Sequence, residues 1–277
     1  TLPGNVTATN SHEEALTGAD AAIFAVPSAF LRGVARDCAP YVSDSLPVLC
    51  LAKGIELGTG LLMSDVIASE IGHPERIAAL SGPNHAEEIC HGSLSASTIA
   101  CESVEVGEFF KELTLSPAFR VYLSSDMVGV ELCGAMKNVM AIICGIAAGS
   151  GMGDNALALI MTRGLAEMSR IGEACGAQAA TFMGLSGLGD LALTCTGDLS
   201  RNRQVGLRLG QGESLEHITS SLGMVAEGVK TTSAVYDLAR RLGVETPVTD
   251  TVQGLLHGGE SPREAVMRLM TRTLRQE

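Results

Sequence analysis

The chain has 277 residues, of which 46% are hydrophobic, so it can bury a sizeable core as one large domain or two modest ones. This composition excludes an intrinsically disordered protein. A formal net charge of −12, with six Phe, three Tyr and no Trp, excludes a general nucleic-acid binder, because such proteins need basic surfaces and aromatic stacking platforms.

The region before Ser124 alternates short apolar runs with helical patterns. Apolar strands that alternate with helices indicate a parallel sheet covered on both faces, so we expect an α/β domain at residues 1–124. Strands are predicted at Asn5–Thr9, Ala21–Val26, Val48–Ala52, Ile77–Leu80, Ala96–Ala100 and Arg120–Leu123. Helices are predicted at Ser11–Thr17, Ser28–Cys38, Leu61–Ile71, His85–Cys90 and Val104–Leu113.

The region from residue 125 onward loses the strand pattern, and residues 125–277 are predicted to form an all-α domain. Residues that favour the first position of a helix recur through it, each ahead of an apolar helical period. These helix starts are Asp126, Asp154, Ser200 and Ser261.

The cysteines indicate a reducing compartment. There are eight of them, mostly in apolar stretches and with no C-x-x-C pair, which is typical of buried free thiols rather than of disulfides or a metal site. No basic segment followed by an apolar one opens the chain, so no signal peptide is expected. We therefore expect a cytoplasmic protein without a metal.

Lys137 and Asn138 lie in the most apolar stretch, residues 127–149, together with Glu131. These polar side chains make a poor membrane span, so we expect a buried helix and no membrane span. Burial lowers the pKa of a lysine, which makes Lys137 a candidate proton donor and acceptor near neutral pH, and Asn138 is placed to orient the same ligand. The alternative is that Lys137 extends along the helix to solvent.

Asp190 follows a glycine-rich segment, Gly184–Gly189, and begins an apolar run. Two interpretations stay open from the pattern alone. Asp190 either caps a helix, or its carboxylate pairs with Lys137 and holds the lysine's charge.

The run Ser200-Arg201-Asn202-Arg203 lies at a predicted helix start. Free backbone N–H groups, the positive end of the helix dipole and an arginine meet there, which favours a phosphate monoester. The alternative is an ordinary capped helix with solvated arginines.

Three predicted strands end in small or polar residues: Pro27, Lys53 with Gly54, and Ser81–Asn84. In open parallel sheets ligands bind outside the carboxyl ends of strands, so these residues favour one shared crevice, although ordinary turns would use the same residue types. The nucleotide fingerprint G-x-G-x-x-G is not found in the sequence.

Seven motifs, in order along essentially the whole chain, resemble those of the bacterial-type NAD(P)-dependent glycerol-3-phosphate dehydrogenases. They are VPS at Val26–Ser28, KGIE at Lys53–Glu56, SGPNHAEE at Ser81–Glu88, VELCGAMKNV at Val130–Val139, GLGDLALTC at Gly187–Cys195, SRNRQVG at Ser200–Gly206 and VAEGVKT at Val225–Thr231.

The resemblance implies a Rossmann-like dinucleotide-binding domain at residues 1–124 and a helical substrate-binding domain at 125–277, with NAD or NADP as cofactor. It implies that Lys137 is the catalytic acid–base and Asp190 its active-site partner. The implied substrate contacts are Lys53, Gly82, Asn84, Asn138, Thr194, Ser200, Arg201 and Asn202. The implied cofactor contacts are Pro27, Lys53, Ala86, Arg201, Val225 and Glu227. We also expect a homodimer.

Two departures from the family pattern stand out. Many relatives have Ser-Phe where this chain has Asn84-His85, but an asparagine still hydrogen-bonds a substrate hydroxyl. The family also begins with a strand, G-x-G-x-x-G and a helix, whereas this sequence starts after that unit. We therefore expect a nucleotide domain that is truncated at its start, and the residues before Thr1 would test this.

The predicted activity is the NAD(P)H-linked interconversion of dihydroxyacetone phosphate and sn-glycerol 3-phosphate, which supplies glycerol 3-phosphate for phospholipid synthesis. One alternative is a truncated, catalytically silent helical module for dimerisation or phosphate binding. Another is a related dehydrogenase of a 3-hydroxy acid, against which the phosphate-binding pattern at Ser200–Asn202 argues.

Overall fold

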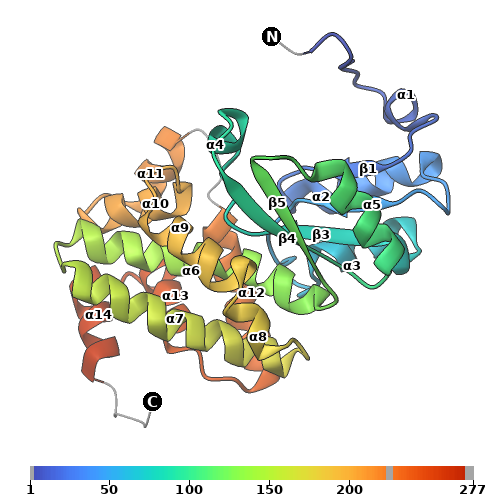
Figure 1. The fold of residues 1–277 in the computed structure, drawn as a ribbon. Helices are drawn as coiled ribbons and strands as arrows, with labels where there is room; N and C mark the ends of the chain where they lie inside the picture. The colour runs from blue at the N-terminus through green and yellow to red at the C-terminus, as the bar shows by residue number, and fades with distance from the viewer. Residues whose placement is uncertain (1–2, 223–226, 272–277) are drawn as a thin grey trace.

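The computed structural model describes residues 3–222 and 227–271. The chain has two halves (Figure 1): the first contains a β-sheet, and the second is helical. Among the described residues the sheet has five strands, in the spatial order β1-β2-β3-β4-β5. The strands are β1 (Ala22–Phe24), β2 (Val48–Cys50), β3 (Ile77–Ser81), β4 (Ser95–Cys101) and β5 (Phe119–Ser124). The helices of this half are α1 (His12–Leu16), α2 (Ser28–Cys38), η1 (Ala39–Tyr41), α3 (Met63–Ile71), η2 (Pro74–Arg76), α4 (Ala86–Cys90) and α5 (Val104–Thr114).

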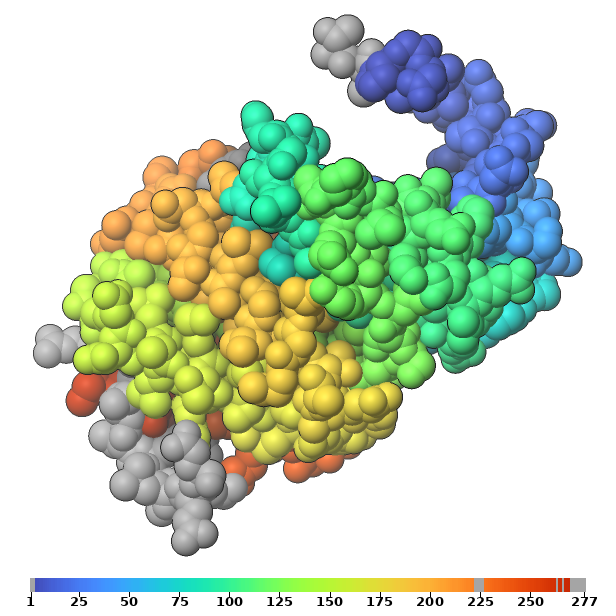
Figure 2. Space-filling model, in the orientation of Figure 1, coloured from blue at the N-terminus to red at the C-terminus, as the bar shows by residue number. Residues whose placement is uncertain are grey.

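The predicted α/β architecture is confirmed, with two corrections. The strand predicted at Asn5–Thr9 is wrong: these residues form no strand, Val6 is 49% exposed, and the segment before β1 projects away from the molecule (Figure 2). Among the described residues this short run has no neighbouring strand, and the Val6 N–H donates instead to the Pro3 carbonyl oxygen at 3.0 Å.

The predicted parallel sheet is parallel at every strand pair but one, β3 with β4. β1, β2 and β3 are parallel to one another and β4 is parallel to β5, but β3 and β4 are antiparallel, with Ala79 opposite Ala100. The segment between β3 and β4 contains only the five-residue helix α4, so the chain re-enters the sheet at the end where β3 leaves it instead of crossing a face.

Helices cover both faces of the sheet. On β2, the side chains of Val48 and Cys50 pack in one cluster with α2 and α3, whereas Leu49 packs in another with Phe110 of α5. Burial on both faces explains why the strands read as continuous apolar runs.

The helical half is built around α6 (Met127–Gly149). Asp126 caps it as predicted, since its Oδ1 accepts from the Gly129 N–H at 2.9 Å. The helices around it are α7 (Asp154–Ala174), α8 (Ala179–Phe182), the π-helical turn η3 (Leu185–Gly189), α9 (Asp190–Thr196), α10 (Arg201–Gly210), α11 (Leu215–Leu222), α12 (Glu227–Leu242), α13 (Pro247–His257) and α14 (Pro262–Thr271).

Within the described residues, α6 is the one helix long and apolar enough, by length and composition, to cross a membrane. Since 89% of its most apolar window is buried inside the protein, it is the core helix of the helical half. Glycine lets α10 lie directly on it: a Cβ at Gly206 would come within 1.9 Å of the Ile142 carbonyl oxygen. This close approach packs the backbone of α10 against the C-terminal half of α6.

Candidate active site

Lys137 lies in the buried middle of α6, and its ammonium group has two partners on α9. Its Nζ donates to Oδ1 of Asp190 at 2.6 Å and to Oγ1 of Thr194 at 3.0 Å. Because the Lys137 side chain is only 9% exposed, the alternative in which it extends to solvent is wrong.

Asp190 accepts from a second lysine as well. The Nζ of Lys53, from the loop after β2, lies 2.8 Å from Oδ2 of Asp190. Burial by itself raises the pKa of Asp190, but the charges and hydrogen bonds of Lys53 and Lys137 outweigh it and hold that pKa below its ordinary value. The helix-cap interpretation of Asp190 is wrong, because Gly189 occupies the cap of α9 and the carboxylate lies between the two ammonium groups.

The surroundings of Lys137 lower the pKa of its ammonium group. Burial, followed by repulsion from Lys53, lowers the pKa of Lys137 to about 8, while Asp190 opposes the shift. A lysine with such a pKa populates both its charged and its neutral form near physiological pH, as a reversible acid–base catalyst requires.

Glycine and a π-helical turn bring Asp190 to this position. A Cβ at Gly187 would lie 2.0 Å from the carbonyl oxygen of Phe182, so only glycine fits at this position of η3. The turn leads directly into α9, and one helical turn later Thr194 donates to the Asp190 carbonyl oxygen at 2.6 Å. The glycine-rich pattern ahead of Asp190 therefore serves a close backbone approach.

The carboxyl ends of β2 and β3 meet at Lys53. Its Nζ also donates to the Gly82 carbonyl oxygen at 3.1 Å and to Oδ1 of Asn84 at 2.9 Å. Gly82 has φ +144°, and a Cβ there would lie 2.9 Å from the Cα of Ser97, so the close packing of this loop requires glycine. Two of the three predicted strand ends are thus joined by hydrogen bonds of Lys53, which also links them to α9.

A second group of predicted residues meets where α2 and α12 begin. Pro27 caps α2, and the Ser28 N–H donates to Oε1 of Glu227 at 3.2 Å. The next residue of α12, Gly228, donates its N–H to Oδ1 of Asn202 at 3.0 Å. Pro27, Asn202 and Glu227 are thus brought together, and the Asn202 side-chain oxygen is engaged by α12.

Asn138 and the start of α10 adjoin this second group. A Cβ at Gly228 would lie 2.9 Å from the Asn138 carbonyl oxygen, and Asn138 itself is buried. Ser200 caps α10, with its Oγ accepting from the Arg203 N–H at 3.3 Å. The predicted anion site is therefore a capped helix start, which adjoins Asn138 of α6 through Gly228.

Three other predicted residues take different places. Arg201 is exposed in the first turn of α10, and Ala86 is exposed at the start of α4, outside the hydrogen-bonded group around Asp190. Val225 lies outside the described residues. In the part of the chain that the structure describes, no three His, Cys, Asp or Glu side chains gather as a metal would require, and all eight cysteines are free.

Comparison with known proteins bears on this geometry. The family profile described as the NAD-dependent glycerol-3-phosphate dehydrogenase N-terminus matches residues 1–107, and the one described as the C-terminus matches residues 126–267. The chain belongs to the NAD-dependent glycerol-3-phosphate dehydrogenase family. The family resemblance proposed from the motifs is thereby confirmed.

Relatives of this family are similar over most of their length. A glycerol-3-phosphate dehydrogenase (NAD(P)+) of Oleidesulfovibrio alaskensis is 49% identical over 277 residues, which is 100% of this chain and 84% of that protein. One from Desulfovibrio desulfuricans is 51% identical, covering 92% of this chain and 77% of its own length. The crystal structure of the Coxiella burnetii glycerol-3-phosphate dehydrogenase superposes with a TM-score of 0.93 at 35% identity, over 98% of this chain and 82% of that one.

These matches confirm that the chain is an NAD(P)-dependent dehydrogenase by family, with NAD or NADP as the cofactor class. The residues present fit such a cofactor, because three parallel strands end at one edge, followed by Pro27, Lys53 and Gly82, and ligands of open parallel sheets bind at that edge. By the family resemblance, the described residues that would hold it are Pro27, Lys53, Ala86, Arg201 and Glu227.

Sequence reasoning missed two features that support the site. Arg32 forms a bidentate ion pair with Glu56, which lies on the same loop as Lys53. Glu131 of α6 accepts a hydrogen bond from Ser64 at the start of α3. Both pairs join residues far apart in the sequence, and neither follows a helical or strand period that a sequence pattern would reveal.

Proposed function

We propose that the chain interconverts dihydroxyacetone phosphate and sn-glycerol 3-phosphate with NAD(P)H. One observation carries this function. A buried lysine has its pKa lowered to about 8 and two of its N–H groups fixed by Asp190 and Thr194, and the next residue, Asn138, adjoins through Gly228 the start of a helix suited to a phosphate. The family membership of the chain supports the same assignment.

Lys137 acts as the general acid and base in this mechanism. A nicotinamide cofactor held at Pro27 and Glu227 would supply hydride-transfer chemistry at C2 of the substrate. In the reducing direction Lys137 donates a proton to the C2 oxygen as negative charge develops there, and in the oxidising direction it removes the hydroxyl proton. Asp190 keeps the ammonium group oriented, and Lys53 and Asn138 contact the substrate from either side of it.

The start of α10 holds the substrate's phosphate. The N–H groups of its first turn and the Arg201 guanidinium provide the donors, and Ser200 and Asn202 flank them. Phosphate binding several bonds from C2 fixes the carbonyl against Lys137, so binding energy at a remote group accelerates the reaction. A 3-hydroxy acid has no group for these donors, which favours the phosphorylated substrate.

Exchange of Lys137 for alanine tests the function. In an assay of NADH consumption with dihydroxyacetone phosphate, we expect Lys137→Ala to lower kcat by roughly 10²–10⁴-fold with a small change in KM. The control is Lys111→Ala, which removes an exposed lysine paired with Glu108 at 2.7 Å and should leave kcat unchanged. Near-normal turnover by Lys137→Ala would refute the assigned role.

A cofactor titration separates this function from the silent-module alternative. A chain that binds glycerol 3-phosphate, yet neither binds NAD(P)H nor transfers a hydride, would support the silent module instead. The family relatives favour the enzyme. Its product is the glycerol backbone of phospholipids, so the proposed role is to supply that backbone.

Three further parts of the proposal follow from the family and the chain. Free cysteines throughout favour a cytoplasmic location. Residues 1–124 and 125–277 form the cofactor and substrate domains, a division supported by the change from strands to helices after β5. The family resemblance supports a homodimer, which light scattering of the purified chain would measure.

A further inference from the structure

The loop between β2 and α3 carries Lys53 and folds back on itself. Ile55 pairs with Leu62 across the loop, the Glu56 N–H donates to the Leu61 carbonyl oxygen at 2.9 Å, and the Gly60 N–H donates to the Glu56 carbonyl oxygen at 2.9 Å. Lys53 stands at the start of this loop. Its distance from Asp190 therefore depends on where the folded loop sits on the domain.

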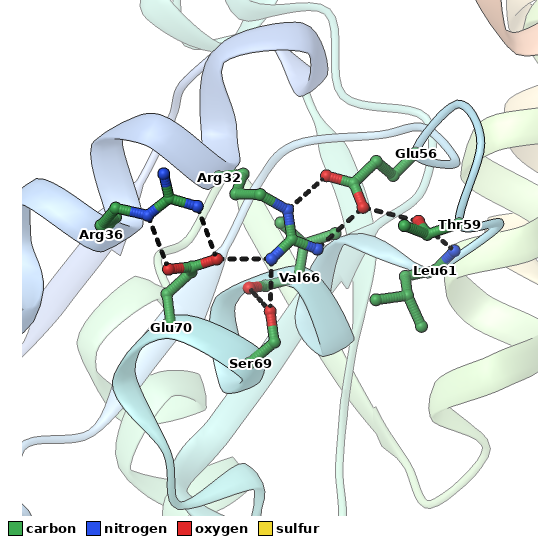
Figure 3. Close-up of polar contacts among 8 residues, drawn as sticks. All are labelled: Arg32, Arg36, Glu56, Thr59, Leu61, Val66, Ser69 and Glu70. Carbon is green, nitrogen blue, oxygen red and sulfur yellow. Dashed lines mark hydrogen bonds and ion pairs between the residues drawn. The ribbon is translucent and has the colours of Figure 1, made fainter.

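Arg32 of α2 binds this loop through a bidentate ion pair with Glu56 (Figure 3). Its Nε lies 2.7 Å from Oε1 of Glu56, and its Nη2 lies 2.8 Å from Oε2. The remaining nitrogen, Nη1, donates to Oγ of Ser69 at 2.8 Å and to Glu70, both on α3. One planar guanidinium thus joins α2, α3 and the loop, which a lysine's point charge would not do.

The ion pair between Arg32 and Glu56 is partly shielded from solvent. The side chains of Arg32 and Glu56 are 29% and 19% exposed, and Thr59 adds a hydrogen bond to Oε2 of Glu56 at 2.6 Å. The hydrogen bond that Glu56 accepts from Arg32 holds the pKa of Glu56 below its ordinary value. The pair is therefore an ion pair at neutral pH with a defined geometry.

The same helix touches the loop at a second point, next to Lys53. A Cβ at Gly54 would lie 2.9 Å from the Cβ of Ser28, the first residue of α2. Ser28 is also the residue whose N–H donates to Glu227 of α12. From the other half of the molecule, Arg241 donates to the Thr59 carbonyl oxygen at 3.1 Å. A shift of the loop along α2 would therefore move Lys53 relative to α9.

We propose that Arg32 is a positioning residue: through Glu56 it fixes the 53–62 loop on α2 and α3, and so sets where the Lys53 ammonium meets Asp190. This role rests on the function proposed above for Lys53 and Asp190. It adds a specific residue, remote from the substrate, on which the active-site charges depend.

The chain offers a matched control on the same helix. Arg36 lies one turn after Arg32 and pairs with Glu70, 3.1 Å from Nε to Oε2, but makes no contact with Glu56 (Figure 3). The comparison is therefore between Arg32→Gln and Arg36→Gln, each of which removes one guanidinium from α2. Thermal unfolding of both variants checks that the fold is retained.

Kinetics form the first arm of the test. Arg32→Gln should lower kcat/KM for dihydroxyacetone phosphate by roughly 10–100-fold, because small displacements of a positioned group cost rates of that order, and Arg36→Gln should stay close to wild type. Glu56→Gln should reproduce the Arg32→Gln loss, and the double variant should be no worse than either single one. Equal losses in Arg32→Gln and Arg36→Gln would overturn the positioning role.

The second arm needs no turnover, so it separates this role from the proposed function. NMR of the lysine side chains follows the titration of Lys137 in the substrate-free protein. If Arg32→Gln moves Lys53 away, the Lys137 midpoint rises, because it loses a repelling charge; in Arg36→Gln it stays in place. Amide exchange at Glu56, Gly60 and Leu61 should also be faster in Arg32→Gln alone.

The outcomes are distinct. A wild-type chain that turns over no substrate, but whose Lys137 midpoint shifts in Arg32→Gln only, would refute the proposed function and retain the positioning role. An unchanged midpoint together with unchanged exchange in Arg32→Gln would refute the positioning role, whatever the activity of the wild type.

Discussion

Two buried carboxylates beside α6 behave in opposite ways. Glu131, on α6 itself, accepts from the Ser64 N–H at 3.0 Å and from the Ser64 hydroxyl, both neutral donors, and burial raises its pKa to about 7. Asp190 is as deeply buried, but two lysine ammonium groups within 2.8 Å hold its pKa low. Burial is common to both regions, so the charge of the neighbours decides which carboxylate is ionised.

The two carboxylates also bind different kinds of partner. Glu131 accepts from a buried N–H of the first turn of α3, which has no partner within the helix, and so attaches the sheet-containing half to α6. Asp190 instead holds two cations where a substrate oxygen would bind. Variants of the two residues should therefore change different measurements.

The largest expected effect comes from Asp190→Asn. This nearly isosteric change leaves Lys53 and Lys137 without their counter-ion, which lowers the pKa of Lys137 further and removes the general acid at neutral pH. We expect kcat for reduction to fall by roughly 10²–10⁴-fold. Since it leaves two buried cations unpaired, the free energy of unfolding should also fall by about 3–5 kcal/mol.

The control is Asp250→Asn, at a partly exposed ion pair in which Oδ1 lies 2.6 Å from Nη2 of Arg240. It should cost about 0–1 kcal/mol, as exposed pairs do, with kcat unchanged. Equal effects of the two variants, measured by denaturant unfolding and steady-state kinetics, would show that burial does not distinguish them.

A second prediction concerns pH. Reduction needs protonated Lys137, so its rate should fall as pH rises through about 8, whereas oxidation of glycerol 3-phosphate needs the neutral form and should rise through the same midpoint. Lys53→Met removes the charge that repels Lys137, so both midpoints should move to higher pH. Lys111→Met serves as the control, and a midpoint that moves equally in both variants would contradict the coupling.

The smallest effect is expected at Glu131 and appears in stability. Because its folded pKa of about 7 lies above the ordinary value of 4.5, the folded state binds more protons between these pH values, and the free energy of unfolding falls as pH rises through that window. Glu131→Gln removes this dependence. Relative to wild type, it should gain up to about 3 kcal/mol between pH 4.5 and pH 8.

Thermal or denaturant unfolding at several pH values measures this gain, with kcat as the second readout. The exposed Glu108→Gln is the control and should follow the wild-type trend. A flat difference between wild type and Glu131→Gln would show that Glu131 is ionised in the fold like Asp190.

Much of the proposed catalytic centre was predictable, because a lysine within an apolar helix is unusual. A lysine in the apolar run of α6 needs a buried counter-ion, and an aspartate after a glycine-rich turn was one candidate. The residue types left a helix cap open as well, and the family resemblance selected the pairing of Lys137 with Asp190. The second lysine on Asp190 was predicted only as a ligand contact. Its place opposite Lys137 depends on how the loop after β2 meets α9.

The sequence by itself determined the alternation of strands and helices, the bounds of α2 at Ser28–Cys38, the cap of α6 at Asp126 and the family motifs, because periodicity and capping act over neighbouring residues. Only the tertiary structure decided that β4 runs antiparallel to β3, that Arg32 holds Glu56, and that Glu131 and Asp190 have opposite pKa shifts. These features depend on distances between groups that are remote in the chain, and electrostatic energies follow those distances rather than any local pattern.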